Sequence, residues 1–239
     1  MIIPIRDIDI RFVPEPLSMP SGLRDQVPAT WARLSAVNPK IWDGRILGVS
    51  GIGGGPPRVD NGVLSGEARE YAYSAFLTWR ELGTPEIGIR NLFGSAVVVS
   101  SDKSLLLGKM ADWTGNAGLI YPAAGSLEPR DVVDGRVRVL DSLTRELNEE
   151  MGLEASEAQV GPTLAIFEGP RVSVARGLHF SEDTDTLLGR VRANLEAQSE
   201  RELADVVAVR TRRELEAAGE FPPYVGELMD AFEAGRFEC

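Results

Sequence analysis

The chain has 239 residues, of which 43% are hydrophobic and 26% are charged, and its formal net charge is −11. This composition excludes a disordered chain, and no apolar run is long enough to span a bilayer. The net negative charge and the scattered lysines and arginines argue against general binding to nucleic acid. The start of the chain, MIIPIRDIDI, lacks the features of a signal peptide, so we expect a cytoplasmic protein with neither a nucleic-acid nor a membrane partner.

The rarest reactive side chains limit the possible chemistry further. Cys239 is the single cysteine, which excludes a disulfide framework and a cysteine-based zinc site. His179 is the single histidine, so any site with two imidazoles is excluded as well. Because His179 ends an alternating stretch, we expect it to be a strand residue and not a catalytic base.

Residues 1–90 are predicted to form an N-terminal extension of strands and helices packed on the rest. The glycine-rich segment GIGGGPP could suggest dinucleotide binding, but RVDNGVL follows it where a helix would be needed. A hairpin turn or mobile loop is the better interpretation. The expected elements are a strand in 8–16, a helix in 28–39, a strand in 41–62 that runs into this loop, and a helix in 65–82.

Residues 91–239 are predicted to form a second domain with an α+β fold, in which helices flank a mixed sheet as in an α/β/α sandwich. Two apolar runs flank the polar turn SSDK, as the strands of a hairpin do. Proline at 222 and 223 marks the start of the last helix. The expected strands are 96–99, 105–107, 118–125, 163–168, 171–180 and 205–210, and the expected helices are 137–151, 185–198 and 224–235.

The helix in 137–151 carries an unusual group of acids. Leu140, Leu143, Leu147 and Met151 recur at helical spacing and form one apolar stripe. Three glutamates, Glu146, Glu149 and Glu150, lie off this stripe and share a neighbouring face. Like charges at this spacing repel, so the cluster is either a solvated acidic surface or a site for a positive ion, and carboxylate oxygens suit magnesium or manganese.

The residues around these glutamates resemble a known motif. The sequence from Arg145 to Leu153, RELNEEMGL, matches every specified position in the second half of the Nudix box, R-E-U-x-E-E-x-G-U, where U is bulky and apolar. The first half is less regular, because GSLEPRD, from Gly125 to Asp131, has Asp where the family has Glu. Thirteen residues then separate Asp131 from Arg145, about six more than in the family. We expect residues 132–139 to be a loop or early helical turn at the rim of the site.

This resemblance implies a Nudix-like fold and a catalytic role for the glutamates. Glu149 and Glu150 would bind Mg²⁺ or Mn²⁺, Glu146 would be a further ligand or the base that deprotonates water, and the Gly125 carbonyl would complete the metal site. Arg145 would orient the glutamates through ion pairs, although an exposed arginine without a function is the alternative. Family members often use one more acid from a later loop, for which the candidates are Glu168, Glu182, Asp183, Glu200 and Glu202. Glu200 is favoured, because it lies just before a strand expected beside the catalytic helix.

The resemblance also implies a small-molecule substrate. The segments TWARL, residues 30–34, and NPKIWDGRILGV, residues 38–49, are weakly similar to Nudix hydrolases that split UDP-sugars, such as UDP-glucose, into UMP and a sugar 1-phosphate. Hydrolysis of ADP-ribose or another nucleotide is the alternative within the same chemistry. Aromatic residues that could stack on a base are Trp31, Trp42, Tyr73, Trp79, Trp113 and Tyr121, although most are expected in the core. A ligand-binding or regulatory protein without activity, a diphosphate isomerase and a homodimer all remain open.

Overall fold

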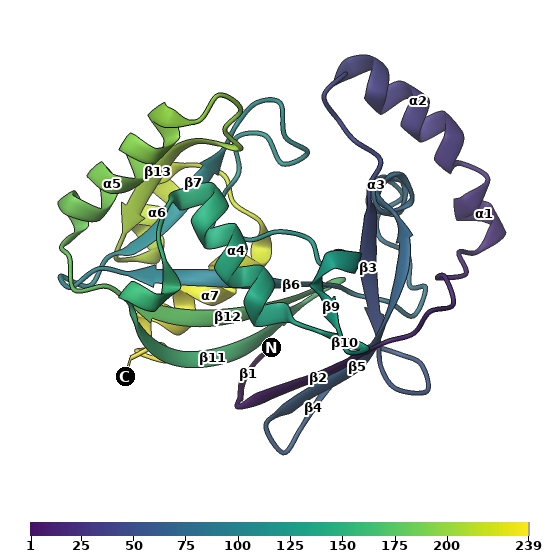
Figure 1. Cartoon of the computed structure of the whole chain (residues 1–239), viewed down its shortest axis with the longest axis horizontal. Helices are drawn as coiled ribbons and strands as arrows, with labels where there is room; N and C mark the ends of the chain where they lie inside the picture. The colour runs from purple at the N-terminus through teal and green to yellow at the C-terminus, as the bar shows by residue number, and fades with distance from the viewer. Residues whose placement is uncertain (239) are drawn as a thin grey trace.

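The computed structural model describes residues 1–238, which form two β-sheets with helices packed around both. Figure 1 shows the larger sheet with α4, α5 and α7 around it, and the smaller sheet carrying α1, α2 and α3 on its other side. None of the helices in residues 1–238 combines the length and the apolar composition that crossing a bilayer requires. The architecture is therefore α+β, with mixed sheets flanked by helices, as the sequence predicts.

The larger sheet has the strand order β1-β11-β12-β6-β7-β13, and β8 pairs with β7. It is mixed, because β12 and β6 are parallel whereas the other pairs are antiparallel. The strands are β1 (Ile2–Ile5), β6 (Asn91–Val99), β7 (Leu105–Met110), β8 (Ile120–Tyr121), β11 (Gln159–Glu168), β12 (Arg171–His179) and β13 (Leu203–Val209). His179 is a strand residue, as expected.

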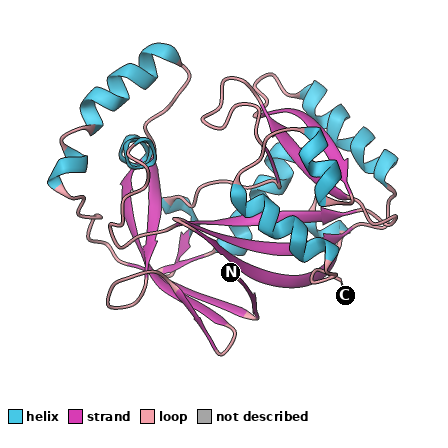
Figure 2. Ribbon diagram, turned by 180° about the vertical axis from the view of Figure 1, so that it is seen from behind, coloured by secondary structure: helices cyan, strands magenta, loops and turns pink. Residues whose placement is uncertain are grey.

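Helices cover both faces of this sheet. On β6, the Phe93 ring meets the Tyr224 ring of α7 (Pro223–Glu233) at 5.1 Å. A Cβ added to the next residue, Gly94, would lie 2.7 Å from the Cβ of Leu143 in α4 (Val139–Met151). Neighbouring strand residues point to opposite faces, so α7 and α4 lie on opposite sides. Figure 2 shows the same layers from behind.

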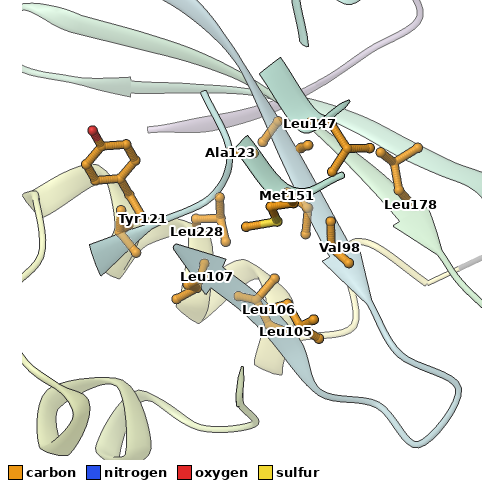
Figure 3. Packing of buried hydrophobic residues seen from close by; sticks show 14 of the residues in the cluster. Val98, Leu105, Leu106, Leu107, Tyr121, Ala123, Leu147, Met151, Leu178 and Leu228 are labelled. Atoms are coloured by element: carbon orange, nitrogen blue, oxygen red, sulfur yellow. The ribbon is translucent and has the colours of Figure 1, made fainter. Parts of the chain in front are cut away.

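The main core forms where these helices meet the larger sheet. Leu147 and Met151 of α4 are fully buried, and so is Leu228 of α7. Figure 3 shows them packed with residues of the central strands, such as Val98 of β6 and Leu106 of β7. Two further helices, α5 (Thr184–Ala197) and α6 (Arg212–Ala218), add Leu187, Val191, Leu195 and Leu215 to this cluster. The apolar stripe predicted for the helix in 137–151 is thus confirmed, with Leu143, Leu147 and Met151 in the cluster and Leu140 partly buried against it.

The smaller sheet has the order β3-β5-β2-β10-β9, and β4 pairs with β5. Its strands are β2 (Asp7–Phe12), β3 (Arg45–Ser50), β4 (Arg58–Asp60), β5 (Val63–Ala72), β9 (Val132–Val133) and β10 (Arg136–Val137). Beside it lie α1 (Ser21–Arg24), α2 (Val27–Val37) and α3 (Tyr73–Glu81), which share a separate apolar cluster around Trp79. The glycine-rich segment between β3 and β4 is a turn, as expected.

Two local predictions are wrong. The helix expected in 65–82 begins only at Tyr73, because residues 63–72 continue as β5, whose side chains alternate in burial and whose backbone pairs with β2, β3 and β4. The insertion in 132–139 is neither a loop nor a helical turn but mainly the hairpin β9–β10, with Asp134 and Gly135 at positive φ. The hairpin pairs with β2 and so extends the smaller sheet.

The two parts of the chain exchange strands. β1 belongs to the larger sheet, where it pairs with β11, although it lies in the first 90 residues. In the other direction, β9 and β10 join the smaller sheet. A shared apolar cluster fills the space between the sheets, with Ile10, Leu47 and Leu64 from the first part and Leu92, Leu127 and Val174 from the second.

Candidate active site

The last two turns of α4 position the three glutamates. Leu143, Leu147 and Met151 anchor one face of the helix in the core, and Gly152 ends it with φ 65° in the left-handed region. The glutamates then fall on neighbouring faces, but their burial differs. Glu146 and Glu150 are buried, whereas the Glu149 side chain is 51% exposed.

Arg145 connects this helix to the end of the first half-motif. Its Nη1 donates a hydrogen bond to Asp131 Oδ1 at 2.5 Å, and its Nη2 donates to Glu146 Oε1 at 3.1 Å. Its Nε lies 3.9 Å from Glu149 Oε1. Asp131 is itself buried and accepts a hydrogen bond from the Glu128 backbone N–H. Arg145 therefore contacts Asp131 and Glu146 directly and lies within ion-pair distance of Glu149.

Gly125 lies directly against the Glu146 carboxylate. A Cβ added at this position would collide with the carboxylate carbon and both oxygens of Glu146. Only glycine allows the chain to pass this close. Burial raises the pKa of Glu146 to about 7, an effect that the nearby Arg145 guanidinium opposes and Glu149 reinforces. The structure thus brings Gly125 and Glu146 together, as the motif requires.

Glu150 is the most deeply buried of the three acids. Burial raises its pKa well above the usual range, and the negative charges of Glu146 and Glu202 add to this effect. The single hydrogen bond to its carboxylate comes from the Ala124 backbone N–H, at 3.2 Å. A buried carboxylate next to other acids is destabilised when ionised unless a positive charge is near. Arg145 contacts Glu146 but makes no ion pair with Glu150.

The donor chemistry of this cluster fits a hard divalent cation. The buried carboxylates of Glu146 and Glu150 supply oxygen ligands, and such a cation would offset the charge that burial disfavours. Within residues 1–238, however, no three acidic, histidine or cysteine side chains converge closely enough to hold a metal ion as they stand. The exposed Glu149 side chain would have to turn toward Glu150 for both to bind the same ion.

The later acids have different surroundings. Glu168, Glu182 and Asp183 have structural contacts, with Arg171, Arg190 and the Thr186 backbone N–H respectively. Glu200, the acid favoured from the sequence, is 72% exposed and pairs with Lys40 at 3.2 Å.

Glu202 is the later acid whose charge is felt by the cluster, although the residue is exposed. Desolvation by the surrounding protein raises its pKa, and the charges of Glu149 and Glu128 add to this effect. The negative charge of Glu202 in turn raises the pKa of both Glu146 and Glu150. Glu202 was one of the candidates from the sequence, but nothing in the sequence distinguishes it from Glu200. The two residues are only two positions apart, and their different surroundings depend on the fold.

A cavity of about 330 Å³ opens beside the glutamates. Ala124, Gly125 and Ser126 form the part of its wall that is next to Glu146 and Glu150. Its other walls are rich in aromatic rings and contain two arginines. These are Tyr73, Phe76 and Arg80 from α3, Phe93 and Tyr121 from the larger sheet, Arg171, and Phe221 and Tyr224 near α7. An apolar pocket with a few polar groups is the usual form of a small-molecule site.

A chain of hydrogen bonds fixes one side of this cavity. Arg80 donates to Asn116 Oδ1 at 2.9 Å and to the Gly115 carbonyl at 2.8 Å. Asn116 in turn donates to the Tyr121 hydroxyl at 3.1 Å. Of the aromatic residues considered from the sequence, Tyr73 and Tyr121 line the cavity, whereas Trp79 is buried in the core and Trp42 is 73% exposed. Phe76, Phe221 and Tyr224 were missed, because no local signal connects them with the motif.

No protein-family model matches the chain, and no curated protein matches its sequence. Its structure is similar to that of a Nudix hydrolase from Nitrosomonas europaea, with 18% identity, a TM-score of 0.42 and coverage of 62% of this chain and 91% of that one. An Ap4A hydrolase from C. elegans has 15% identity, a TM-score of 0.41 and coverage of 59% and 95%. The NUDIX domain of Shewanella oneidensis NrtR, solved with ADP ribose, has 12% identity, a TM-score of 0.40 and coverage of 66% and 96%. At these values the similarities carry no conclusion about activity, which rests on the site.

Proposed function

We propose that the protein is a Nudix-type hydrolase that uses Mg²⁺ or Mn²⁺ to cleave the diphosphate bond of a nucleoside diphosphate joined to a second group. One observation carries this proposal: the last two turns of α4 bury Glu146 against Gly125 and Glu150 against the Ala124 backbone N–H, and both Ala124 and Gly125 line an aromatic cavity. An acidic surface with no function would leave these carboxylates in solvent. Both are buried instead, next to a space large enough for a ligand.

The residues have separable roles in this proposal. Glu149 and Glu150 would hold the cation, and Glu146 and the Gly125 carbonyl are its further ligands unless Glu146 is the base. A bound divalent ion supplies positive charge for the diphosphate oxygens and lowers the pKa of water. Arg145 holds Glu146 and Asp131 in position. We assign Glu202 the role of the additional acid in place of Glu200, because Glu202 shares the electrostatic environment of Glu146 and Glu150.

The cavity supports a nucleotide as the substrate class. Its aromatic rings offer stacking surfaces for a base, and Arg80 and Arg171 bring positive charge to its wall. Within this class we propose a UDP-sugar, on the weak similarity of residues 30–34 and 38–49, and ADP-ribose or another nucleotide as the alternative. A ligand-binding protein without activity would use the same cavity but would not need two buried glutamates beside it.

Hydrolysis of a substrate panel tests the proposal. The protein is incubated with UDP-glucose, ADP-ribose and related nucleotides, and the products are separated by chromatography. We expect a nucleoside monophosphate and a second phosphate ester, with activity lost in EDTA and restored by Mg²⁺ or Mn²⁺ but poorly by Zn²⁺, because the proposed ligands are all oxygen atoms. Full activity in protein freed of metal, or tight binding of these nucleotides without any hydrolysis, would contradict it.

A further inference from the structure

A second cavity lies at the opposite end of α4 from the glutamates. It has a volume of about 170 Å³ and is formed by the β1–β2 connection, the β10–α4 connection and the strands β11 and β12. A volume of this size holds a few water molecules, at about 30 Å³ each, or one phosphate group. We call it the arginine pocket, because Arg6, Arg138 and Arg176 line it.

Most arginines of the described residues pair with an acid, whereas two of the three in this pocket do not. Within residues 1–238, the side chains of Arg6 and Arg176 form no ion pair, and Arg138 is 3.9 Å from Asp141 at its closest. The chain as a whole has 36 acidic residues against 25 lysines and arginines, so acids are not scarce. Asp7 and Asp141 also line the pocket, which leaves an excess of one positive charge. Asp7 accepts a hydrogen bond from the Ile8 backbone N–H.

Arg176 is the most constrained of the three. It lies on β12 opposite Thr163 of β11, and its Nε donates to the Thr163 hydroxyl at 2.9 Å. Its side chain is about half buried, and this burial lowers the pKa of the guanidinium. A partly desolvated cation without a counter-charge is unfavourable, and an anion in the cavity would remove that cost.

The first turn of α4 adds backbone donors to the same pocket. No side chain caps this end of the helix. In the described residues, the N–H groups of Val139 and Leu140 have no hydrogen-bond acceptor, and both residues line the cavity. Free N–H groups at a helix start favour an anion, and Val139 is buried, so bulk water satisfies its N–H poorly.

We propose that the arginine pocket is a binding site for a phosphate group, held by Arg6, Arg138 and Arg176 together with the free N–H groups of Val139 and Leu140. The geometry of guanidinium groups suits a tetrahedral dianion. This site is separate from the active-site cavity, because its residues lie on the first turn of α4 and the glutamates lie on the last two. It does not depend on the proposed hydrolysis.

Calorimetric titration with inorganic phosphate tests this site. The full chain is titrated in EDTA at constant ionic strength, and sulfate and chloride are titrated separately. We expect saturable binding of phosphate and sulfate, and no competition from chloride. Arg176→Gln should weaken phosphate binding about tenfold or more, since a hydrogen bond to a charged group contributes that much. Because Arg176 is half buried, the exposed Arg6→Gln and Arg138→Gln variants give the same test with little risk to folding.

Three controls make the result specific. Arg213→Gln removes one exposed, unpaired charge from α6, and it should bind phosphate as the unaltered chain does. Arg80→Gln and Arg171→Gln remove arginines from the active-site cavity and should also leave binding unchanged. The proposal is overturned by the absence of saturable binding, by equal binding of chloride, by unchanged affinity in all three pocket variants, or by loss of binding in the Arg80 or Arg171 variants.

Discussion

Glu200 and Glu202 lie two positions apart and meet different surroundings. Glu200 points into solvent and pairs with Lys40, and an exposed ion pair contributes little to stability or to chemistry. Glu202 shares the field of Glu149 and Glu128, and its pKa is raised. At the scale of single residues, the environment of a carboxylate decides its role more than its distance from a motif does.

These two acids give a direct comparison. We expect Glu202→Gln to lower kcat at saturating Mg²⁺ by about tenfold or more, as the loss of an acid or base in catalysis does. Glu200→Gln should stay within about twofold of the unaltered enzyme, because it removes only an exposed pair. Steady-state kinetics on the best substrate of the panel measures both. The opposite order of effects would restore Glu200 as the additional acid.

The helix glutamates can be tested without loss of the fold. Glu149→Gln and Glu150→Gln keep the shape of the side chain but remove the charge for a cation, so we expect each to lower turnover by about 100-fold or more. Circular dichroism and thermal melting should show that both variants remain folded. Glu196→Gln, an exposed glutamate on α5, is the matched control. Normal turnover by both variants would reduce the cluster to an acidic surface.

At the scale of elements, the close packing of α4 on the larger sheet positions two cavities. The helix rests on β6 at Gly94, where there is no space for a side chain between the strand and the helix. Its first turn lines the arginine pocket, and its last turns carry the glutamates. The position of the whole helix relative to the sheet therefore fixes both cavities.

We expect Gly94→Ala to destabilise the protein by about 1–3 kcal/mol, because the new Cβ would lie 2.7 Å from the Cβ of Leu143 and 3.0 Å from the Val139 carbonyl oxygen. Gly189→Ala on α5 is the control, since its Cβ would meet nothing within 4 Å. That variant should gain up to about 1 kcal/mol from helix propensity. Urea unfolding measures both, and a neutral Gly94→Ala would show that α4 is free to move away from β6.

At the scale of the whole molecule, the two parts of the chain complete each other. β1 extends the larger sheet, the β9–β10 hairpin extends the smaller one, and one apolar cluster contains residues from both. The active-site cavity likewise combines α3 from the first part with Gly125 and Tyr224 from the second. Whether residues 1–90 and 91–239 are separate domains is therefore best tested by producing each part as a fragment.

A fragment of residues 91–239 should not fold as an independent domain. Removal of residues 1–90 would expose Leu92, Val172 and Val174, which are fully buried in the intact chain, and would leave the β9–β10 hairpin without β2. We expect a weak near-ultraviolet circular dichroism signal and no cooperative melting, both restored by adding a fragment of residues 1–90. Cooperative melting of residues 91–239 alone, with the signal of the full chain, would establish two independent domains.

The sequence by itself determined the helix α4 and the helix faces on which its glutamates lie. The apolar stripe, the glycine at 152 and the spacing of the acids are relations over three or four residues, which the helical repeat converts directly into faces. The central strands could be predicted for the same reason, because their long apolar runs are local signals. The Asp-Gly turn of the β9–β10 hairpin is also a local signal. Because the Nudix box has a shorter segment here, residues 132–139 were expected to be a loop or helical turn and not a hairpin.

Only the tertiary structure decided what surrounds this helix. Gly125 contacts Glu146 across twenty-one positions of sequence, Glu202, just before β13, raises the pKa of Glu146, and cavity walls come from residues 73–80 and 221–224. The pairing of β1 with β11 and the gathering of Arg6, Arg138 and Arg176 are equally non-local. Such contacts form when the two sheets bury their shared apolar surface. The free energy gained by this burial depends on the packing of the whole chain, so no single segment predicts it.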